Sequence, residues 1–237
     1  MGTAAAVSSP DGRCPPLDRV GADVNSSVMT LEPVCPRCSG RLDPPGLRSS
    51  AWVCHDHGEV HPYHHRSTAP SAESVAWLAA RAKVPVWCPW PLPPGWLVTG
   101  TAHAGDERTG PRATVVALSG PAPLGGTGEL LLVAEEPGIG LGARFAGLSG
   151  PDAGPLSERT APHARVHTAG HPTALWNVDS EQDRVAYVGE ALGCWLWAVL
   201  WPDTAGLVVQ DRLALVDLRD SGHPLDLPFG APSPRLT

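Results

Sequence analysis

The sequence contains Cys35-Pro-Arg-Cys38 and, after fifteen further residues, Cys54-His-Asp-His57. Two thiolates separated by two residues can bind one ion from a tight turn, and a second pair brought alongside by a short hairpin completes a tetrahedron of three sulfurs and one imidazole. The spacing is close to the zinc pattern of two short pairs separated by 15–20 residues. We therefore expect residues 31–66 to form a zinc ribbon that binds one structural Zn²⁺ through Cys35, Cys38, Cys54 and His57.

Two nearby histidines, His55 and His61, are alternatives to His57 as the fourth ligand. We favour His57 because it leaves two residues after Cys54, which matches the spacing of the first cysteine pair. Four protein ligands close the tetrahedron, whereas a catalytic zinc keeps one position open for water. The pattern therefore predicts a structural metal, and we identify no catalytic residue in the ribbon.

The composition of the whole chain favours β structure. Its 237 residues are 42% hydrophobic and 17% charged, and they include 27 prolines and 26 glycines, which interrupt long helices. We predict a mainly β fold, a β-rich α+β architecture in which the small N-terminal zinc ribbon precedes a mostly antiparallel β domain. The expected organisation is a disordered N-terminal extension at 1–30, the ribbon at 31–66, a linker and helix at 67–83, and the β-rich domain at 84–237.

The distribution of charge argues against nucleic acid as the partner. The net charge is −7; residues 31–66 carry four arginines and four acids, whereas residues 84–237 carry nine arginines and sixteen acids. Nucleic-acid binding depends on basic side chains that contact phosphates. Nucleic-acid binding through the ribbon therefore stays a weaker alternative, and we expect an unknown protein partner.

The cysteine spacing also bears on localisation. Cysteine pairs with metal-ligand spacing are typical of a reducing compartment. Residues 1–30 lack a basic start followed by an apolar run, and no apolar run reaches the ~20 residues that a membrane-spanning helix needs. We expect a cytoplasmic protein without a membrane segment. Met29 lies six residues before Cys35, so we also hypothesise that translation starts there.

Periodicity predicts one helix and a series of strands. Ser71 can cap a helix at 72–83, in which Val75 and Leu78 share one face. Residues 194–201 are apolar at both alternating sets of positions, which is typical of a central strand covered on both faces. The predicted strands are 97–103, 113–118, 130–134, 143–148, 164–168, 174–178, 184–188, 194–201 and 207–216.

The stretch Val84-Pro-Val-Trp-Cys-Pro-Trp-Pro-Leu-Pro-Pro-Gly-Trp96 cannot be helical, because it contains five prolines. Extended backbone is expected, lying across an edge or face of the sheet that follows. Trp87, Trp90 and Trp96 could form an interaction surface, since aromatic residues are enriched at interfaces. The alternative is that they pack in the core.

The sequence Gly138-Ile-Gly140-Leu-Gly142-Ala-Arg144 follows an apolar strand, as a dinucleotide-binding loop would. Glu135 places negative charge where a pyrophosphate would bind, and no βαβ unit follows. A phosphorylated ligand held by Arg144 and the backbone amides of this loop remains the alternative function, that of an enzyme or a small-molecule sensor.

Other catalytic signatures are missing from the sequence. It contains no Gly-x-Ser-x-Gly elbow, no His-Glu-x-x-His motif and no Gly-Lys pair of a P-loop. Asp217 and Asp220, with His223 nearby, are interpreted as surface ion-pairing groups rather than as an acid–base pair. Cys88 and Cys194 lie among apolar residues and are expected to be inert core thiols.

Several of these stretches together resemble one actinobacterial family that carries only a domain-of-unknown-function label. The similar segments are Cys35-Pro-Arg-Cys38, the Val-Pro-Val-Trp-x-Pro-Trp-Pro-Leu-Pro-x-Gly-Trp run at 84–96, and the segments 120–126, 138–144, 195–198 and 217–220. The resemblance covers residues 34–236. It implies a cytoplasmic zinc-ribbon protein and transfers no catalytic residues. Our interpretation is a non-enzymatic zinc-ribbon protein that binds a protein partner or a ligand.

Overall fold

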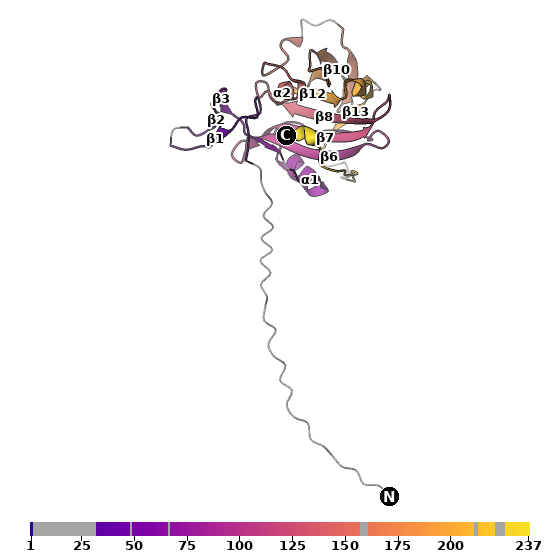
Figure 1. Cartoon of the computed structure of the whole chain (residues 1–237), viewed down its shortest axis with the longest axis horizontal. Coiled ribbons are helices and arrows are strands. Elements are labelled where there is room, and N and C mark those ends of the chain that lie inside the picture. The colour runs from indigo at the N-terminus through magenta and orange to yellow at the C-terminus, as the bar shows by residue number, and fades with distance from the viewer. Residues whose placement is uncertain (2–31, 48, 66, 157–160, 211–212, 221–225) are drawn as a thin grey trace.

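The computed structural model describes residues 1, 32–47, 49–65, 67–156, 161–210, 213–220 and 226–237. The disordered extension expected at 1–30 falls, apart from Met1, outside the described residues. Figure 1 shows a small sheet, formed by β1, β2 and β3, beside a much larger β body.

The small sheet is antiparallel and has the order β1-β2-β3, with β1 at Leu42–Asp43, β2 at Trp52–Cys54 and β3 at Gly58–Val60. Among the residues that the structure describes, the apolar cluster of this region has only Cys35, Leu42 and Cys54 as buried members, with Trp52 and Val60 packed against it. So little buried surface contributes little folding energy. The small sheet therefore depends on a metal or on its neighbours for its stability.

The large sheet contains ten strands within the described residues, in the order β4-β6-β7-β8-β12-β11-β10-β9-β13-β5. All neighbouring pairs are antiparallel except β13 with β9, so the predicted mainly β, mostly antiparallel fold is confirmed. The strands are β4 (Tyr63–His65), β5 (Trp87–Pro89), β6 (Leu97–Asp106), β7 (Gly110–Pro121), β8 (Thr127–Glu135), β9 (Ala164–Thr168), β10 (His171–Val178), β11 (Val185–Ala191), β12 (Cys194–Trp201) and β13 (Ala214–Asp217).

The strand β12 lies between β8 and β11, which confirms the prediction of a central strand at 194–201. Its alternate residues belong to two different hydrophobic clusters: Leu196 to one, Trp197 and Val199 to the other. Both faces of the sheet are thus covered here, which explains why neither set of alternating positions is polar.

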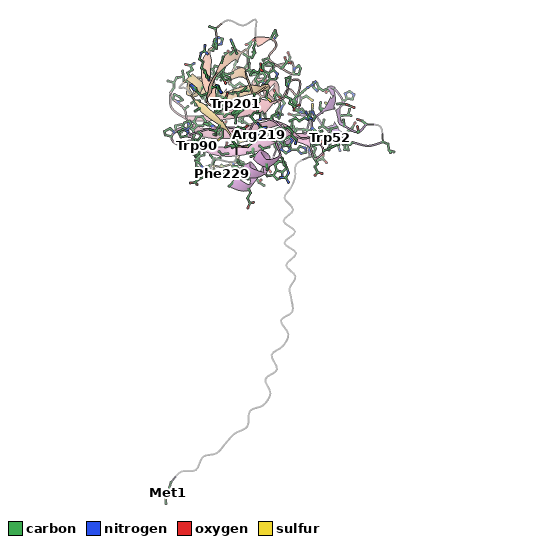
Figure 2. All side chains as sticks on the ribbon, turned by 180° about the vertical axis from the view of Figure 1, so that it is seen from behind. Met1, Trp52, Trp90, Trp201, Arg219 and Phe229 are labelled. Atoms are coloured by element: carbon green, nitrogen blue, oxygen red, sulfur yellow. The ribbon has the colours of Figure 1, made fainter. Side chains whose placement is uncertain are left out.

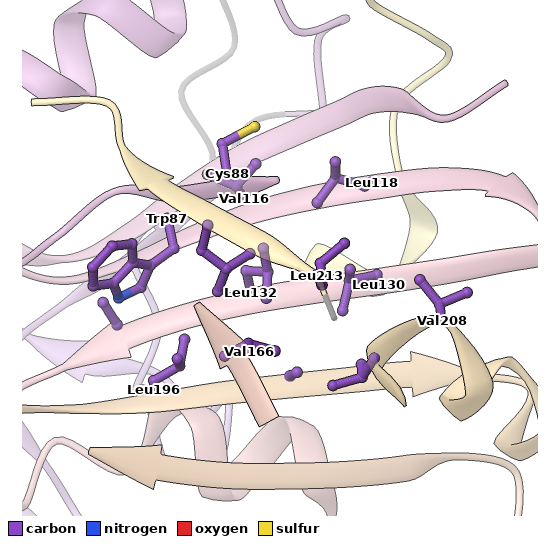
Figure 3. Close-up of a cluster of buried hydrophobic side chains, with 14 of the residues drawn as sticks. Trp87, Cys88, Val116, Leu118, Leu130, Leu132, Val166, Leu196, Val208 and Leu213 are labelled. Carbon is purple, nitrogen blue, oxygen red and sulfur yellow. The ribbon is translucent and has the colours of Figure 1, made fainter. Parts of the chain in front are cut away.

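The two hydrophobic clusters lie on opposite faces of the central strands. In the first, the edge strand β5 and its neighbour β13 fold back over β7 and β8, and Trp87 packs near Leu132 and Leu196 (Figure 3). In the second, the helix α2 (Leu141–Ala146) packs against β8 and β12. The chain ends in the 3-10 helix η3 (Pro234–Leu236), whose Leu236 also lies in the second cluster.

The helix expected at 72–83 is α1 (Ala72–Arg81). It begins with the predicted cap: the amide of Ser74 donates to the hydroxyl of Ser71, and the amide of Ser71 donates to the hydroxyl of Ser74. Val75 and Leu78 are buried against the sheet, as the helical periodicity predicts. The helix contacts β6 and β7 and lies beside them in Figure 1.

The strand predicted at 143–148 is wrong, because α2 occupies residues 141–146 and Gly147 ends it. Gly140 and Gly147 adopt left-handed conformations at the two ends of α2, and the carboxylate of Glu135 accepts hydrogen bonds from the first amides of the helix. These local contacts outweigh the β propensity of the apolar residues.

The strand predicted at 207–216 is also wrong over its first half. The 3-10 helix η2 (Asp203–Gly206) continues into α3 (Leu207–Gln210), and β13 begins only at Ala214. The consecutive residues Val208 and Val209 are both buried in the first cluster. A strand would direct them to opposite faces, whereas a helix allows both to contact the same core. Within the described residues, the structure contains no helix long and apolar enough to cross a membrane.

Asp217 is a buried carboxylate, 5% exposed, rather than the surface group that the sequence suggested. Its Oδ1 accepts from the amide of Val86 at 3.0 Å, and its Oδ2 accepts from Nε and Nη2 of Arg219 at 2.9 and 2.6 Å. Arg219 also donates to the carbonyl of Lys83 at 3.1 Å. The pair therefore ties β13 to the segment between α1 and β5. His223 lies outside the described residues.

We expect Asp217→Ala to lower the free energy of unfolding by about 2–4 kcal/mol, since it leaves the buried amide of Val86 without an acceptor and Arg219 without its carboxylate. The matched control is Asp220→Ala, three residues along on the exposed surface, for which we expect a change within about 0.5 kcal/mol. Urea unfolding followed by tryptophan fluorescence measures both. Equal effects of the two substitutions would contradict the structural role of Asp217.

Candidate metal centre

The two Cys-containing segments of the small sheet meet at one point. The first forms a turn in which the amide of Ser39 donates to the carbonyl of Cys35 at 2.9 Å, and the amide of Cys35 donates to the carbonyl of Gly40 at 2.8 Å. In the second, Cys54 ends β2 and Gly58 begins β3 with a positive φ of 68°. This tight hairpin brings His57 back alongside Cys54.

The ligand atoms of Cys35, Cys38, Cys54 and His57 all lie within 4.8 Å of one another. Sγ of Cys38 is 3.7 Å from Sγ of Cys54, and Nδ1 of His57 is 3.6 Å from Sγ of both Cys35 and Cys54. A zinc tetrahedron with Zn–S of about 2.3 Å and Zn–N of about 2.0–2.1 Å has S···S edges of about 3.8 Å and S···N edges of about 3.6 Å. The cluster therefore fits a metal ion such as zinc.

The structure selects His57 from the three candidate histidines. The side chain of His55 is 98% exposed and pairs with Asp56 at 3.0 Å. His61 is half-buried beyond β3 and is absent from the group of ligand atoms that lie together among the described residues. The choice made from residue spacing thus agrees with the geometry.

Burial and hydrogen bonding affect the cluster's thiols in opposite ways. Burial raises the pKa of Cys35 to about 12. Burial also opposes ionisation of Cys54, but hydrogen bonds from His57 and from the backbone amides of Asp56 and His57 outweigh it and lower the pKa of Cys54 to about 7. Since a metal binds thiolates, binding at this centre must release at least the proton of Cys35.

The turn that carries Cys35 and Cys38 is attached to the β body through the loop 138–144, which we call the glycine loop. Arg37 donates from Nε to the carbonyl of Ile139 at 3.2 Å and from Nη2 to the carbonyl of Gly138. In the reverse direction, Arg144 donates from Nη1 to the hydroxyl of Ser39. The ribbon is therefore held against the β body by one residue within the first cysteine pair and by another directly after it.

A second attachment lies at the end of the ribbon. The backbones of Val34 and Tyr63 exchange hydrogen bonds of 3.0 and 2.8 Å, so the two ends of the ribbon lie side by side at strand β4. Arg108, in the β6–β7 hairpin, donates to the carbonyl of Ser50 at 3.3 Å. Together these contacts place the small sheet directly on the larger one.

The backbone amides that follow the glycine turn contact a different partner from those of a phosphate-binding loop. The amides of Leu141 and Gly142 donate to the carboxylate of Glu135 at 2.8 and 3.2 Å. A Cβ at Gly142 would lie 2.2 Å from the indole of Trp197, so this glycine is required by close packing. The amides at the start of α2 thus contact the chain's own carboxylate, at the place where the sequence suggested a phosphorylated ligand.

The sequence suggested that the side chain of Arg144 and the backbone amides of the glycine loop bind that ligand together. In the structure, the side chain of Arg144 lies in a different place from the amides. Its guanidinium lies over the rings of Tyr63 and Phe145, at 4.7 and 4.6 Å from their centroids. Gly138 and Gly140 both have positive φ and shape the turn that precedes α2. Gly138 offers its carbonyl to Arg37.

The three tryptophans suggested as an interaction surface lie mainly in the core. Trp87 and Trp96 are 1% and 4% exposed, and Trp90 is partly buried against the same cluster. The structure therefore corrects the surface interpretation for Trp87 and Trp96: Trp87 lies in β5, which is folded inwards over β7 and β8, and Trp96 packs against Gly120 and Gly128. Cys88, next to Trp87, is buried, and burial raises the pKa of its thiol to about 12, as expected of an inert core cysteine.

A groove of about 1120 Å³ lies between the ribbon, α1 and the β6–β7 hairpin. Trp52 reaches it from β2, and Trp77 from the outer face of α1; Figure 2 shows Trp52 at the ribbon. The rings of His64 and His103 stack at 5.0 Å, and Trp77 lies 5.1 Å from His103.

Both signs of charge line the groove as well, from Arg81, Lys83, Arg108, Asp106 and Glu107. Sequence reasoning missed this groove. The available signal was that Trp77 lies off the apolar face of α1, where a large aromatic residue has no core to fill.

The fold and the cluster together define a mainly β protein with a Cys3His group able to bind a metal. A family model described as a family of unknown function, DUF6758, matches residues 29–236, and the chain belongs to that family. No curated protein and no solved structure gives a significant match to this chain.

Glu135 makes folding stability depend on pH. Burial raises its pKa from 4.5 to about 7, although the amides of Leu141 and Gly142 oppose that shift. In this interval the folded chain holds a proton that the unfolded chain has lost, so stability falls as the pH rises from about 4.5 and levels off above about 7. We expect the stability of wild type relative to Glu135→Gln to fall by about 2–3 kcal/mol over this range. Urea unfolding at several pH values measures this difference, and parallel pH profiles would contradict it.

Proposed function

We propose that this chain is a non-enzymatic, zinc-stabilised binding protein whose ribbon forms one wall of a binding site for a protein partner. One observation carries the proposal: β2 supplies both the metal ligand Cys54 and the groove residue Trp52. A metal at the cluster would therefore hold the groove wall in place. The role of the metal is structural, and its stoichiometry is one Zn²⁺ per chain.

The ligand set supports a structural role for zinc. Three thiolates and one imidazole complete the tetrahedron, so no position stays open for water or substrate. The apolar cluster around Cys35 and Leu42 is small, and an ion would supply the folding energy that it lacks. Thiolate ligation also supports the reducing cytoplasm as the location of the protein.

The chemistry of the groove supports a segment of a protein as its occupant. Its volume of about 1120 Å³ lies at the upper end of the roughly 300–1,000 Å³ that is usual for small-molecule sites, so it has room for a peptide segment. Aromatic residues and arginine are enriched at protein interfaces, and here Trp52, Trp77 and Arg81 lie together, with the guanidinium of Arg81 at 4.9 Å from the centroid of Trp77. Acidic and basic side chains at the rim can pair with either charge on the partner.

We expect purified wild type to contain one zinc per chain by mass spectrometry, and Cys54→Ser to lose it together with the hydrogen-exchange protection of the ribbon amides. Cys194→Ser is the matched control, since Cys194 is a half-buried thiol of β12 outside the cluster. This control should retain its zinc. Wild type without zinc, or zinc that survives in Cys54→Ser, would refute the structural role.

For the groove, we expect affinity capture from the native host to recover a protein partner with wild type. Trp77→Ala should bind this partner at least about thirtyfold more weakly, which corresponds to a loss of about 2 kcal/mol of binding free energy. Leu124→Ala is the matched control, because Leu124 is an exposed apolar residue of the β7–β8 turn. Capture that is equal in both variants would remove the groove from the proposal. Turnover of a metabolite that a substitution in the β domain abolishes would overturn the non-enzymatic function.

A further inference from the structure

A second cavity, of about 350 Å³, lies on the other side of the metal-binding turn. We call it the arginine pocket, because Arg144, Arg184 and Arg235 line it together with Trp201, Cys38 and Ser39. These residues come from α2, from the segment before β11, from η3, from the end of β12 and from the ribbon. The fold thus brings three cations together from positions 40 to 91 residues apart.

Two of the arginines are fixed on the same indole ring. The guanidinium carbons of Arg184 and Arg235 lie 5.1 and 5.0 Å from the centroid of Trp201, whose position in the β body is labelled in Figure 2. Arg184 donates to the carbonyl of Phe145 at 2.8 Å, and Arg235 donates to Glu129 at 2.6 Å. These contacts hold the two side chains in place before any ligand arrives, which reduces the entropic cost of binding.

Three arginine side chains line the pocket although the chain as a whole carries −7, and one of them, Arg235, is paired with Glu129 at 2.6 Å. No aspartate or glutamate is among the described residues that line it. The carboxylates that pair with Arg184 belong to Glu181 and Asp183, whose side chains are 59% and 54% exposed to solvent. Water screens such exposed pairs, so they neutralise Arg184 only in part.

Arg144 is the least compensated of the three cations. Among the described residues its guanidinium makes no ion pair within 4.0 Å, and its Nη1 donates to the hydroxyl of Ser39. The rings of Tyr63 and Phe145 hold it against the pocket wall. Among the described residues no carboxylate pairs directly with this charge, although Tyr63 and the thiols of Cys35 and Cys38 interact with it electrostatically.

We infer that the arginine pocket binds a small oxyanion-bearing ligand of the phosphate class. Planar guanidinium groups donate paired N–H···O hydrogen bonds to phosphate oxygens, which makes arginine the preferred residue for such sites. The cavity has the volume for a phosphate group with a small organic part. The ligand contacts arginine side chains here, whereas the amides of the glycine loop remain bound to Glu135.

The site is linked to the metal centre. Cys38 is a metal ligand and Ser39 is the residue to which Arg144 donates, and both line the pocket. Retention of the metal keeps this wall in place, so oxyanion affinity should depend on an intact cluster. The groove of the proposed partner site is lined by other residues, so the two sites can be tested separately.

The experiment uses the full zinc-bound chain, with inorganic phosphate as the probe, and measures binding by isothermal titration and by thermal melting. Ionic strength is kept constant with chloride. We expect phosphate to bind and to raise the melting temperature, since it binds the folded chain. Arg184→Gln and Arg235→Gln should each weaken phosphate binding at least about tenfold. The matched control is Arg165→Gln, an exposed arginine of β9, which should bind as wild type does.

Two outcomes would overturn the inference. The first is no phosphate binding by folded wild type. The second is equal binding by wild type, Arg184→Gln and Arg235→Gln, which would identify a general salt effect. Trp77→Ala supplies a further discrimination, because phosphate binding that persists in this groove variant supports a separate site. Loss of phosphate binding in folded Trp77→Ala would contradict the assignment to the arginine pocket.

Discussion

The buried carboxylate of Glu135 determines where α2 begins, and the position of the ribbon follows from α2. Glu135 ends the central strand β8 and accepts hydrogen bonds from the first amides of the helix. The glycine loop between them is thereby held in one conformation, with its carbonyls available to Arg37. A carboxylate so deeply buried is costly unless its acceptor sites are used. The backbone amides of α2 supply the needed donors, and the packing of Gly142 on Trp197 fixes the helix close to β12.

This arrangement makes the ribbon a part of the β body's surface rather than a separate module on a linker. Arg37 and Arg144 join the two in opposite directions, and Val34 pairs with Tyr63 at the edge strand β4. The groove and the arginine pocket both use ribbon residues as walls. A metal in the cluster would thus act on both concave sites without contacting anything that they bind. This indirect role is consistent with a ligand set that leaves no coordination position open.

The sequence was sufficient for features that depend on local spacing and periodicity. The cluster of Cys35, Cys38, Cys54 and His57, which could hold a metal ion, follows from the spacing of short pairs, and β12 follows from its two apolar faces. The helix α2 could not be predicted, because it depends on a carboxylate outside the helix and on close contact with Trp197. The arginine pocket was equally inaccessible: Arg144, Arg184 and Arg235 show no pattern along the chain and meet only through the order of the strands. Trp87 and Trp96 illustrate a third limit, since composition alone does not distinguish a buried aromatic residue from one that a partner contacts.

The bridge between Val34 and Tyr63 has a consequence for how this architecture can vary. Because the two ends of the ribbon leave the β body at adjacent backbone positions, the intervening 28 residues form an excursion that returns to its starting point. The entropic cost of closing such a loop changes only slowly with its length, by about 0.6 kcal/mol for each doubling. A change in the length of this excursion therefore costs little chain entropy, and the ends that join it to the ten-stranded sheet stay paired at Val34 and Tyr63.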